Sequence, residues 1–118
     1  MAATPKVSAI MMDCNDVDAM VAFWGTLLDL EVAATYPEFV FMSPLAEGGP
    51  GLGFQLVPEE KTVKNRVHID LAAEDREAVV AKIIELGGTR IHDHGDEAFK
   101  WTTCADPQGN EFDVADAE

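Results

Sequence analysis

Polar side chains with metal-binding or acid–base chemistry alternate with apolar residues at three places in the chain. In the segment VHIDL, His68 and Asp70 alternate with three apolar residues. Because successive side chains of a β-strand point to opposite faces, His68 and Asp70 would share the polar face of a strand. By the same rule, Phe54 and Leu56 point to the core and Gln55 points away from it. Phe112 and Val114 likewise point to the core, and Glu111 and Asp113 point away from it. We expect these five groups to converge on one concave surface: Gln55, His68, Asp70, Glu111 and Asp113.

Imidazole, carboxylate and amide groups suit a divalent metal such as iron, manganese, nickel or zinc. A metal with open positions can polarise a carbonyl or bind oxygen. A second interpretation is that these residues form the solvated face of a sheet, with His68 hydrogen-bonded to a carboxylate, since one face of such sheets is often open to water. The spacing alone leaves both interpretations open.

The elements that would position these groups follow the same order in both halves. In the first half, Val7–Met12 is an apolar strand, Asn15 or Asp16 caps a helix of 3.6-residue period, and extended runs cover 31–36, 38–42 and 52–57. Residues 58–65 mix Pro with charges and predict an exposed linker.

In the second half, Val67–Ala72 predicts a strand with Val67 on its core side, and Asp75 caps a helix that ends at Gly87 and Gly88. Three more strands follow at 89–92, 99–104 and 110–115. Phe54-Gln55-Leu56 aligns with Phe112-Asp113-Val114, which indicates a tandem repeat. We predict an α+β fold in which two βαβββ modules, about 5–57 and 66–116, form a curved mixed sheet around a cleft, as one domain over residues 1–118.

Composition limits the classes of partner. The 118 residues are 47% hydrophobic, enough for a substantial core, and the formal net charge is −14. Such a charge repels phosphate backbones and anionic lipids, so we expect no nucleic acid and no membrane partner, although the acidity could equally serve solubility. No apolar run suggests a membrane span or a signal peptide, and we expect a cytoplasmic protein.

Several other residues are interpreted as structural. Cys14 and Cys104 lack the spacing of a zinc site or a disulfide framework, and we expect reduced, partly buried thiols. His92 and His94 have the spacing of two ligands on one strand face, but the turn-forming pair Gly95-Asp96 follows them and favours a surface position. Trp24 completes the apolar stripe of the first helix and is expected in the core.

Three segments carry a resemblance to a known family: DVDAMVAFWGTLLDLEV, GFQLVPEEKTVKNRVHIDL and ADPQGNEFDV. Together they resemble the vicinal oxygen chelate superfamily, and within it the small glyoxalase-like and bleomycin-resistance-like proteins, over nearly the whole chain. Metal-dependent members take ligands from the first, fourth, fifth and eighth strands. The resemblance implies His68 on the fifth strand, Asp113 on the eighth where glutamate is usual, and Gln55 on the fourth.

The first-strand position holds Ala9 or Ile10, which cannot bind a metal, and Asp13 is the only nearby substitute. The chain thus resembles the metal-free members more than the lyases. The resemblance then implies a small organic ligand held in the cleft by acidic groups and aromatic walls. The candidates for ligand binding are Gln55, His68, Asp70, Trp101 and Phe41.

The alternative is a divalent-metal-dependent lyase, isomerase or dioxygenase. There His68, Asp113 and Gln55 would hold iron, manganese, nickel or zinc, and Glu111 or Asp70 would act as the catalytic general base. The resemblance also implies a homodimer.

Overall fold

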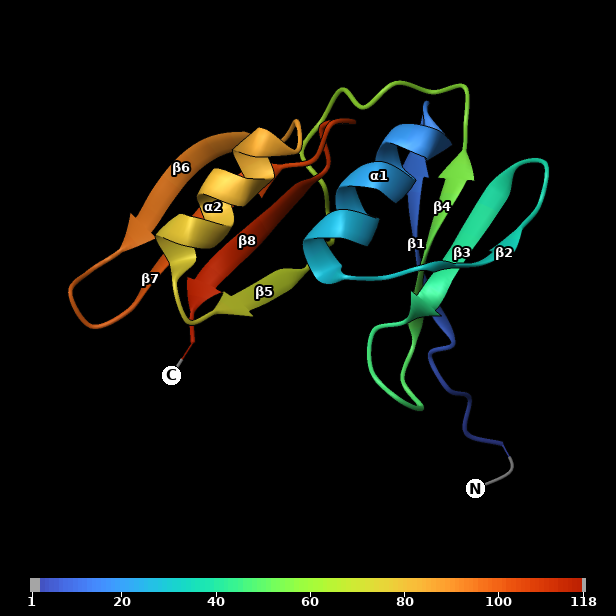
Figure 1. The fold of residues 1–118 in the computed structure, drawn as a ribbon, viewed down its shortest axis with the longest axis horizontal. Helices are drawn as coiled ribbons and strands as arrows, with labels where there is room; N and C mark the ends of the chain where they lie inside the picture. The colour runs from blue at the N-terminus through green and yellow to red at the C-terminus, as the bar shows by residue number, and fades with distance from the viewer. Residues whose placement is uncertain (1–2, 118) are drawn as a thin grey trace. The chain divides into compact units, whose positions relative to one another are not determined.

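The computed structural model describes residues 3–117, and each half of the chain forms one helix and four strands (Figure 1). The first half contains β1 (Ala9–Cys14), α1 (Val17–Leu28), β2 (Val32–Thr35), β3 (Phe39–Pro44) and β4 (Gly51–Leu56). The second contains β5 (Asp70–Ala73), α2 (Arg76–Glu85), β6 (Thr89–Gly95), β7 (Lys100–Ala105) and β8 (Glu111–Asp116). The predicted α+β fold of two tandem βαβββ modules is confirmed.

Each module builds a four-stranded mixed sheet. The strand order is β1-β4-β3-β2 in the first module and β5-β8-β7-β6 in the second. In both, the first and last strands pair in parallel and the remaining neighbours are antiparallel. The boundary between the two compact units falls between Glu60 and Lys61, inside the predicted linker.

Both helices begin at an aspartate: Asp75 is the predicted cap of α2, and Asp16 is one of the two candidates for α1. The Asp16 carboxylate accepts the Ala19 backbone N–H at 3.0 Å, and the Asp75 carboxylate accepts that of Ala78 at 3.1 Å. These bonds satisfy backbone donors that have no partner inside the helix. Asp16, rather than Asn15, is therefore the N-cap of α1.

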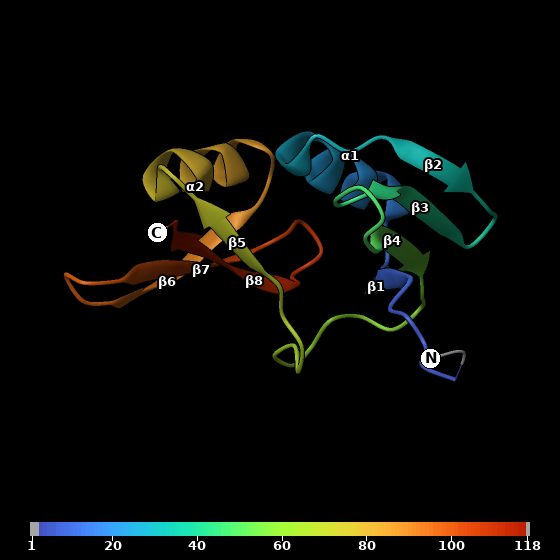
Figure 2. The ribbon, with the colours of Figure 1, turned by 90° about the horizontal axis from the view of Figure 1, so that it is seen from below.

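The core of each module lies between its helix and one face of its sheet. In the first module Trp24 is fully buried beside Phe23, with ring centroids 5.2 Å apart and the rings nearly perpendicular. In the second, Val80 and Ile83 of α2 are buried, as are alternate residues of β7 and β8. Figure 2 shows α2 over one face of the β5–β8 sheet. We call the opposite face, which carries the residues alternating with the buried ones, the open face of the second sheet.

Cys14 and Cys104 are buried and are not joined in a disulfide. Burial raises the pKa of the Cys104 thiol to about 11, with the carboxylates of Asp113 and Asp93 adding to the effect and Arg90 opposing it. Because a thiol with this pKa stays protonated near neutral pH, Cys104 is a core residue and not a nucleophile.

Three local predictions are wrong. The strand expected from Val67 begins only at Asp70, and Val67 is 80% exposed. In the register that pairs Asp70 with Asp113, Val67 would lie opposite Asn110, which belongs to the turn closed by the Asp106 carboxylate. Leu56, expected in the core, lies at the end of β4 and is 45% exposed.

The third difference concerns β6, which continues to Gly95 instead of ending at His92. Its last residues pair with the start of β7, His94 opposite Trp101 and Gly95 opposite Lys100. Within the described residues, neither helix is long and apolar enough to cross a membrane.

Candidate functional site

The second module brings three predicted site residues together. His68 Nε2 lies 3.2 Å from Asp113 Oδ2 and 3.4 Å from Asp70 Oδ1. One ligand atom from each residue lies within 4.8 Å of the other two. We call these residues, His68, Asp70 and Asp113, the His68 cluster.

Strand register explains how the cluster forms. Asp70 and Asp113 are paired residues of the parallel strands β5 and β8. His68 precedes Asp70 by two residues, and the Ile69 carbonyl between them accepts the Asp113 backbone N–H at 3.0 Å. Phe112 and Val114 point into the core, so Asp113 between them points to the open face.

A hydrogen-bonded row continues from the cluster across the open face. The Thr103 hydroxyl donates to Asp113 Oδ1 at 2.6 Å, and His94 Nε2 lies 3.0 Å from the same hydroxyl oxygen. A hydroxyl carries one proton, and Thr103 directs it to Asp113. His94 must therefore donate from Nε2 to Thr103.

Aromatic rings extend this row. The Trp101 ring stacks on His94 with centroids 5.1 Å apart and planes 12° apart, and His92 contacts His94 edge to face at 4.5 Å. Trp101 is thus on the open face, and its role in ligand binding stays a prediction. The sequence interpretation missed His94 because it ended the strand at His92, although the alternate spacing of the two histidines was the available signal.

Glu111, one candidate base, is held by other groups. Its Oε1 lies 3.1 Å from Lys61 Nζ and accepts the Asn65 backbone N–H at 3.1 Å. Burial alone would raise the pKa of Glu111, but the bonds from Asn65 and Lys61 outweigh it and hold the pKa below its ordinary value. A carboxylate stabilised in this way is a weak proton acceptor.

The remaining candidates lie in the first module. Gln55 is exposed on β4, paired with Asp13 of β1 and Phe39 of β3. Phe41 packs against the Phe39 ring with centroids 5.7 Å apart. Gln55 and Phe41 therefore remain predicted ligand-binding residues, and Gln55 remains a predicted metal ligand.

The strand register also revises the first-strand position. Gln55 corresponds to Asp113 in the repeat, and its partner Asp13 corresponds to Asp70, the partner of Asp113. Two residues before Asp13 stands Met11, which therefore corresponds to His68. The counterpart of His68 in the first module is therefore Met11, and not Ala9 or Ile10.

The His68 cluster fits a divalent metal by its chemistry. It offers one imidazole nitrogen and two carboxylates, a donor set suited to iron, manganese, nickel or zinc. His68 would have to present a deprotonated Nε2 to the metal. Thr103 would orient Asp113 from behind, as groups around metal ligands commonly do.

Comparison with known proteins identifies the class. Residues 9–115 match the family model described as a glyoxalase-like domain. The chain belongs to this family, and so to the vicinal oxygen chelate superfamily, as the sequence motifs suggested. Among curated proteins, no sequence matches the chain.

Solved structures of low sequence identity share the fold. A glyoxalase/bleomycin resistance protein/dioxygenase family enzyme from Burkholderia phytofirmans PsJN is 18% identical, with a TM-score of 0.77 over 97% of this chain and 100% of that one. The fosfomycin resistance protein FosX from Listeria monocytogenes is 13% identical, with a TM-score of 0.76 over 98% and 95%. A lactoylglutathione lyase from Agrobacterium tumefaciens is 18% identical, with a TM-score of 0.67 over 96% and 94%.

Proposed function

We propose that this protein binds a small organic molecule on the open face of the second sheet, without an obligatory metal. The observation that carries the proposal is the row from Trp101 through His94, Thr103 and Asp113 to His68. One end of the row offers stacked rings, and the other offers carboxylates. A planar ligand with a cationic or hydrogen-bond-donating group complements both ends.

The contacts within the His68 cluster support a role that needs no metal. His68 Nε2 lies 3.2 Å from Asp113 Oδ2 and 3.4 Å from Asp70 Oδ1, and Asp113 accepts a hydrogen bond from Thr103. An imidazole that carries its proton on Nε2 would interact with both carboxylates, and these side chains form a polar surface from the protein's own atoms. Asp70, the most exposed of the three, would be the first to meet a ligand.

A divalent-metal-dependent lyase, isomerase or dioxygenase is the second candidate, favoured by the proximity of three ligand atoms in the His68 cluster. His68, Asp70 and Asp113 would hold the ion, with Gln55 as a further predicted ligand. A bound metal would supply Lewis-acid polarisation of a substrate oxygen. Asp70 could not then also be the general base, and Glu111 is held by Lys61 and Asn65.

Metal analysis separates the two candidates. The protein would be purified without chelator, assayed for bound first-row metals, and titrated with Mn²⁺, Fe²⁺, Ni²⁺ and Zn²⁺ beside His68→Ala, Asp113→Ala and the matched control His92→Ala. We expect no stoichiometric metal in any of the four proteins. Stoichiometric metal in the parent and in His92→Ala, lost in the two cluster variants, would overturn the proposal in favour of the metalloenzyme.

Ligand binding needs its own assay. A panel of planar aromatic cations, including benzamidine, and their neutral counterparts would be screened by amide chemical shifts. We expect the cations to perturb residues around Asp113 and Trp101, and Asp113→Asn and Trp101→Ala to weaken binding. If no compound of the panel changes the amide chemical shifts of residues on this face, the proposed binding role of the face is contradicted.

We also propose, from the family resemblance, that the protein forms a homodimer. Light scattering coupled to gel filtration measures the mass directly. A mass near the 12.8 kDa of one chain at micromolar concentration would refute this part of the proposal.

A further inference from the structure

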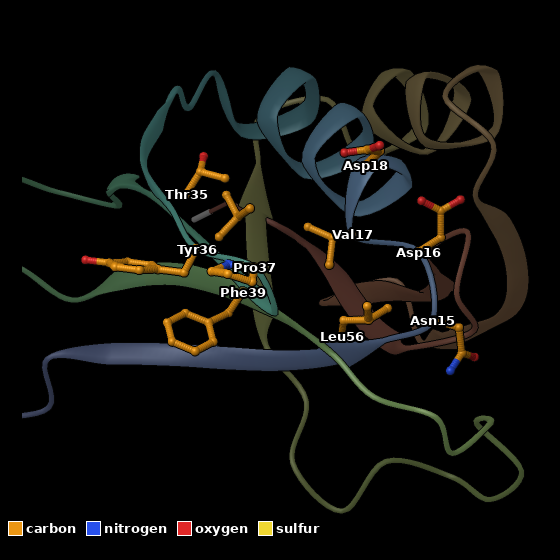
Figure 3. A pocket seen from close by; sticks show the side chains of 10 residues that line it. Asn15, Asp16, Val17, Asp18, Thr35, Tyr36, Pro37, Phe39 and Leu56 are labelled. Carbon is orange, nitrogen blue, oxygen red and sulfur yellow. The ribbon is translucent and has the colours of Figure 1, made fainter.

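The first module contains a groove at the start of α1 (Figure 3). Its volume is about 440 Å³, within the range of about 300–1,000 Å³ for small-molecule sites. All ten residues that line it belong to the first module: Asn15, Asp16, Val17, Asp18, Thr35, Tyr36, Pro37, Phe39, Val40 and Leu56.

Apolar side chains form much of the groove and remain in contact with water. Tyr36 is 50% exposed, and its ring lies 5.0 Å from that of Phe39, tilted by 40°. Leu56 is almost as exposed, although its place in the strand alternation predicted burial. Neighbouring exposed apolar groups of this kind favour a ligand that covers them.

Two carboxylates give the groove its charge. Asp16 and Asp18 flank Val17 in the sequence, and Figure 3 shows all three side chains near the start of α1. Asp16 caps the helix through the Ala19 N–H. The positive end of a helix is equivalent to about half a unit charge, less than the two carboxylates carry. None of the ten described lining residues is a lysine, arginine or histidine.

We propose that this groove binds small organic ammonium ions that carry an aromatic or branched aliphatic body. The apolar body would lie against Tyr36, Phe39 and Leu56, and the ammonium group would lie toward Asp18. The Tyr36 ring adds a π face that attracts a cation. Because all of its residues belong to the first module, the groove is independent of the function proposed for the second sheet.

The test uses 2-phenylethylammonium as the probe and 2-phenylethanol as its neutral counterpart. Titration of the full chain, followed by amide chemical shifts, locates the site and gives the dissociation constant. We expect the ammonium ion to shift the lining residues and to bind more tightly than the alcohol. Asp18→Asn should weaken binding of the ammonium ion about two- to fivefold, as for an exposed ion pair, and leave the alcohol unaffected.

Matched variants separate the groove from general charge effects. Glu47→Gln removes the same charge from an exposed residue outside the lining and should leave affinity unchanged. Tyr36→Ala should weaken binding of the probe about tenfold, because the contact with the ring is lost. Trp101→Ala, in the second module, should have no effect on these shifts.

Three results would overturn the proposal: equal affinity for the ammonium ion and the alcohol, equal weakening by Asp18→Asn and Glu47→Gln, or shifts confined to the second module. Self-association is tested in parallel by light scattering on Leu56→Asp. If this variant loses a dimer that the parent forms, a second copy of the chain covers the groove, which also overturns the proposal.

Discussion

Arg76 should stabilise the second module more than Arg90, although Arg90 bonds both carboxylate oxygens of Glu77. Arg76 donates through Nε to Asp116 of β8 at 3.1 Å and through Nη1 to the Thr102 hydroxyl of β7. These bonds tie the start of α2 to the two strands whose other face carries Thr103 and Asp113. Arg76→Met keeps much of the apolar stem and removes every donor.

Burial sets the size of the effect. The Arg76 side chain is only 12% exposed and Thr102 is fully buried, so the bond between them should contribute about 1–1.5 kcal/mol. Asp116 is 43% exposed, and screening by water reduces that pair to about 0.5–1 kcal/mol. The free energy of unfolding should therefore fall by about 2 kcal/mol, a shift in Tm of about 6–12 °C.

Arg90→Met is the matched control. Arg90 bonds both carboxylate oxygens of Glu77 at 2.9 Å and Asp93 at 2.7 Å, and these bonds hold the pKa of Arg90 above its ordinary value. Its side chain is one-third exposed, and its loss should cost only about 0.5–1 kcal/mol. Urea unfolding of both variants measures the difference, and a larger loss for Arg90→Met would refute the argument from burial.

Three other substitutions test single features of the structure. Gly88→Ala would place a Cβ 2.8 Å from the Ala105 carbonyl oxygen and 2.6 Å from an Ile83 methyl group. The substitution should lower the free energy of unfolding by about 1–3 kcal/mol, measured by urea unfolding. An unchanged urea midpoint would contradict this close approach. Glu111→Gln should lower the free energy of unfolding at neutral pH, because the lowered pKa of Glu111 in the folded state stabilises the fold only while the carboxylate is charged. The difference from the parent should shrink as the pH falls below about 4.5. A difference that does not change with pH would contradict the pairing with Lys61. In a Cys14→Ser background, Cys104 should react with a disulfide reagent at pH 8 far more slowly when folded than when unfolded, whereas equal rates would show that the thiol is accessible.

Periodicity was sufficient to predict most of the fold. The alternation around Phe112 and Val114 placed both in the core and turned Asp113 outward, as the structure has it. The cap of α2 at Asp75 was predictable, and that of α1 was narrowed to Asn15 or Asp16, because capping depends on local sequence. The ends of strands could not be predicted from the sequence, because a strand ends where its partner strand, distant in the sequence, no longer pairs with it. Val67 is exposed because the residue that it would pair with lies in a turn.

The candidate site was partly predictable for the same reason. His68, Asp70 and Asp113 come together because a parallel register pairs two alternating strands, and alternation is visible in the sequence. The contribution of Thr103 depends on its pairing with Asp113 across β7 and β8, and that of His94 on the antiparallel register between β6 and β7, which includes a bulge after Arg90. A single irregularity of this kind changes which residues face each other, and sequence alternation does not reveal it.

The two modules show that equivalent positions of one fold can carry different chemical groups. Both modules offer the same three positions, two at or just before the first strand and one on the last strand. They are occupied by His68, Asp70 and Asp113 in the second module and by Met11, Asp13 and Gln55 in the first. Met11 offers a neutral thioether where the second module has the imidazole of His68. Gln55 offers a neutral amide where it has the carboxylate of Asp113, so the first module lacks the donor set of the His68 cluster. The βαβββ scaffold therefore fixes where functional groups can lie, whereas the side chains at those positions decide between metal chemistry and binding of an organic ligand.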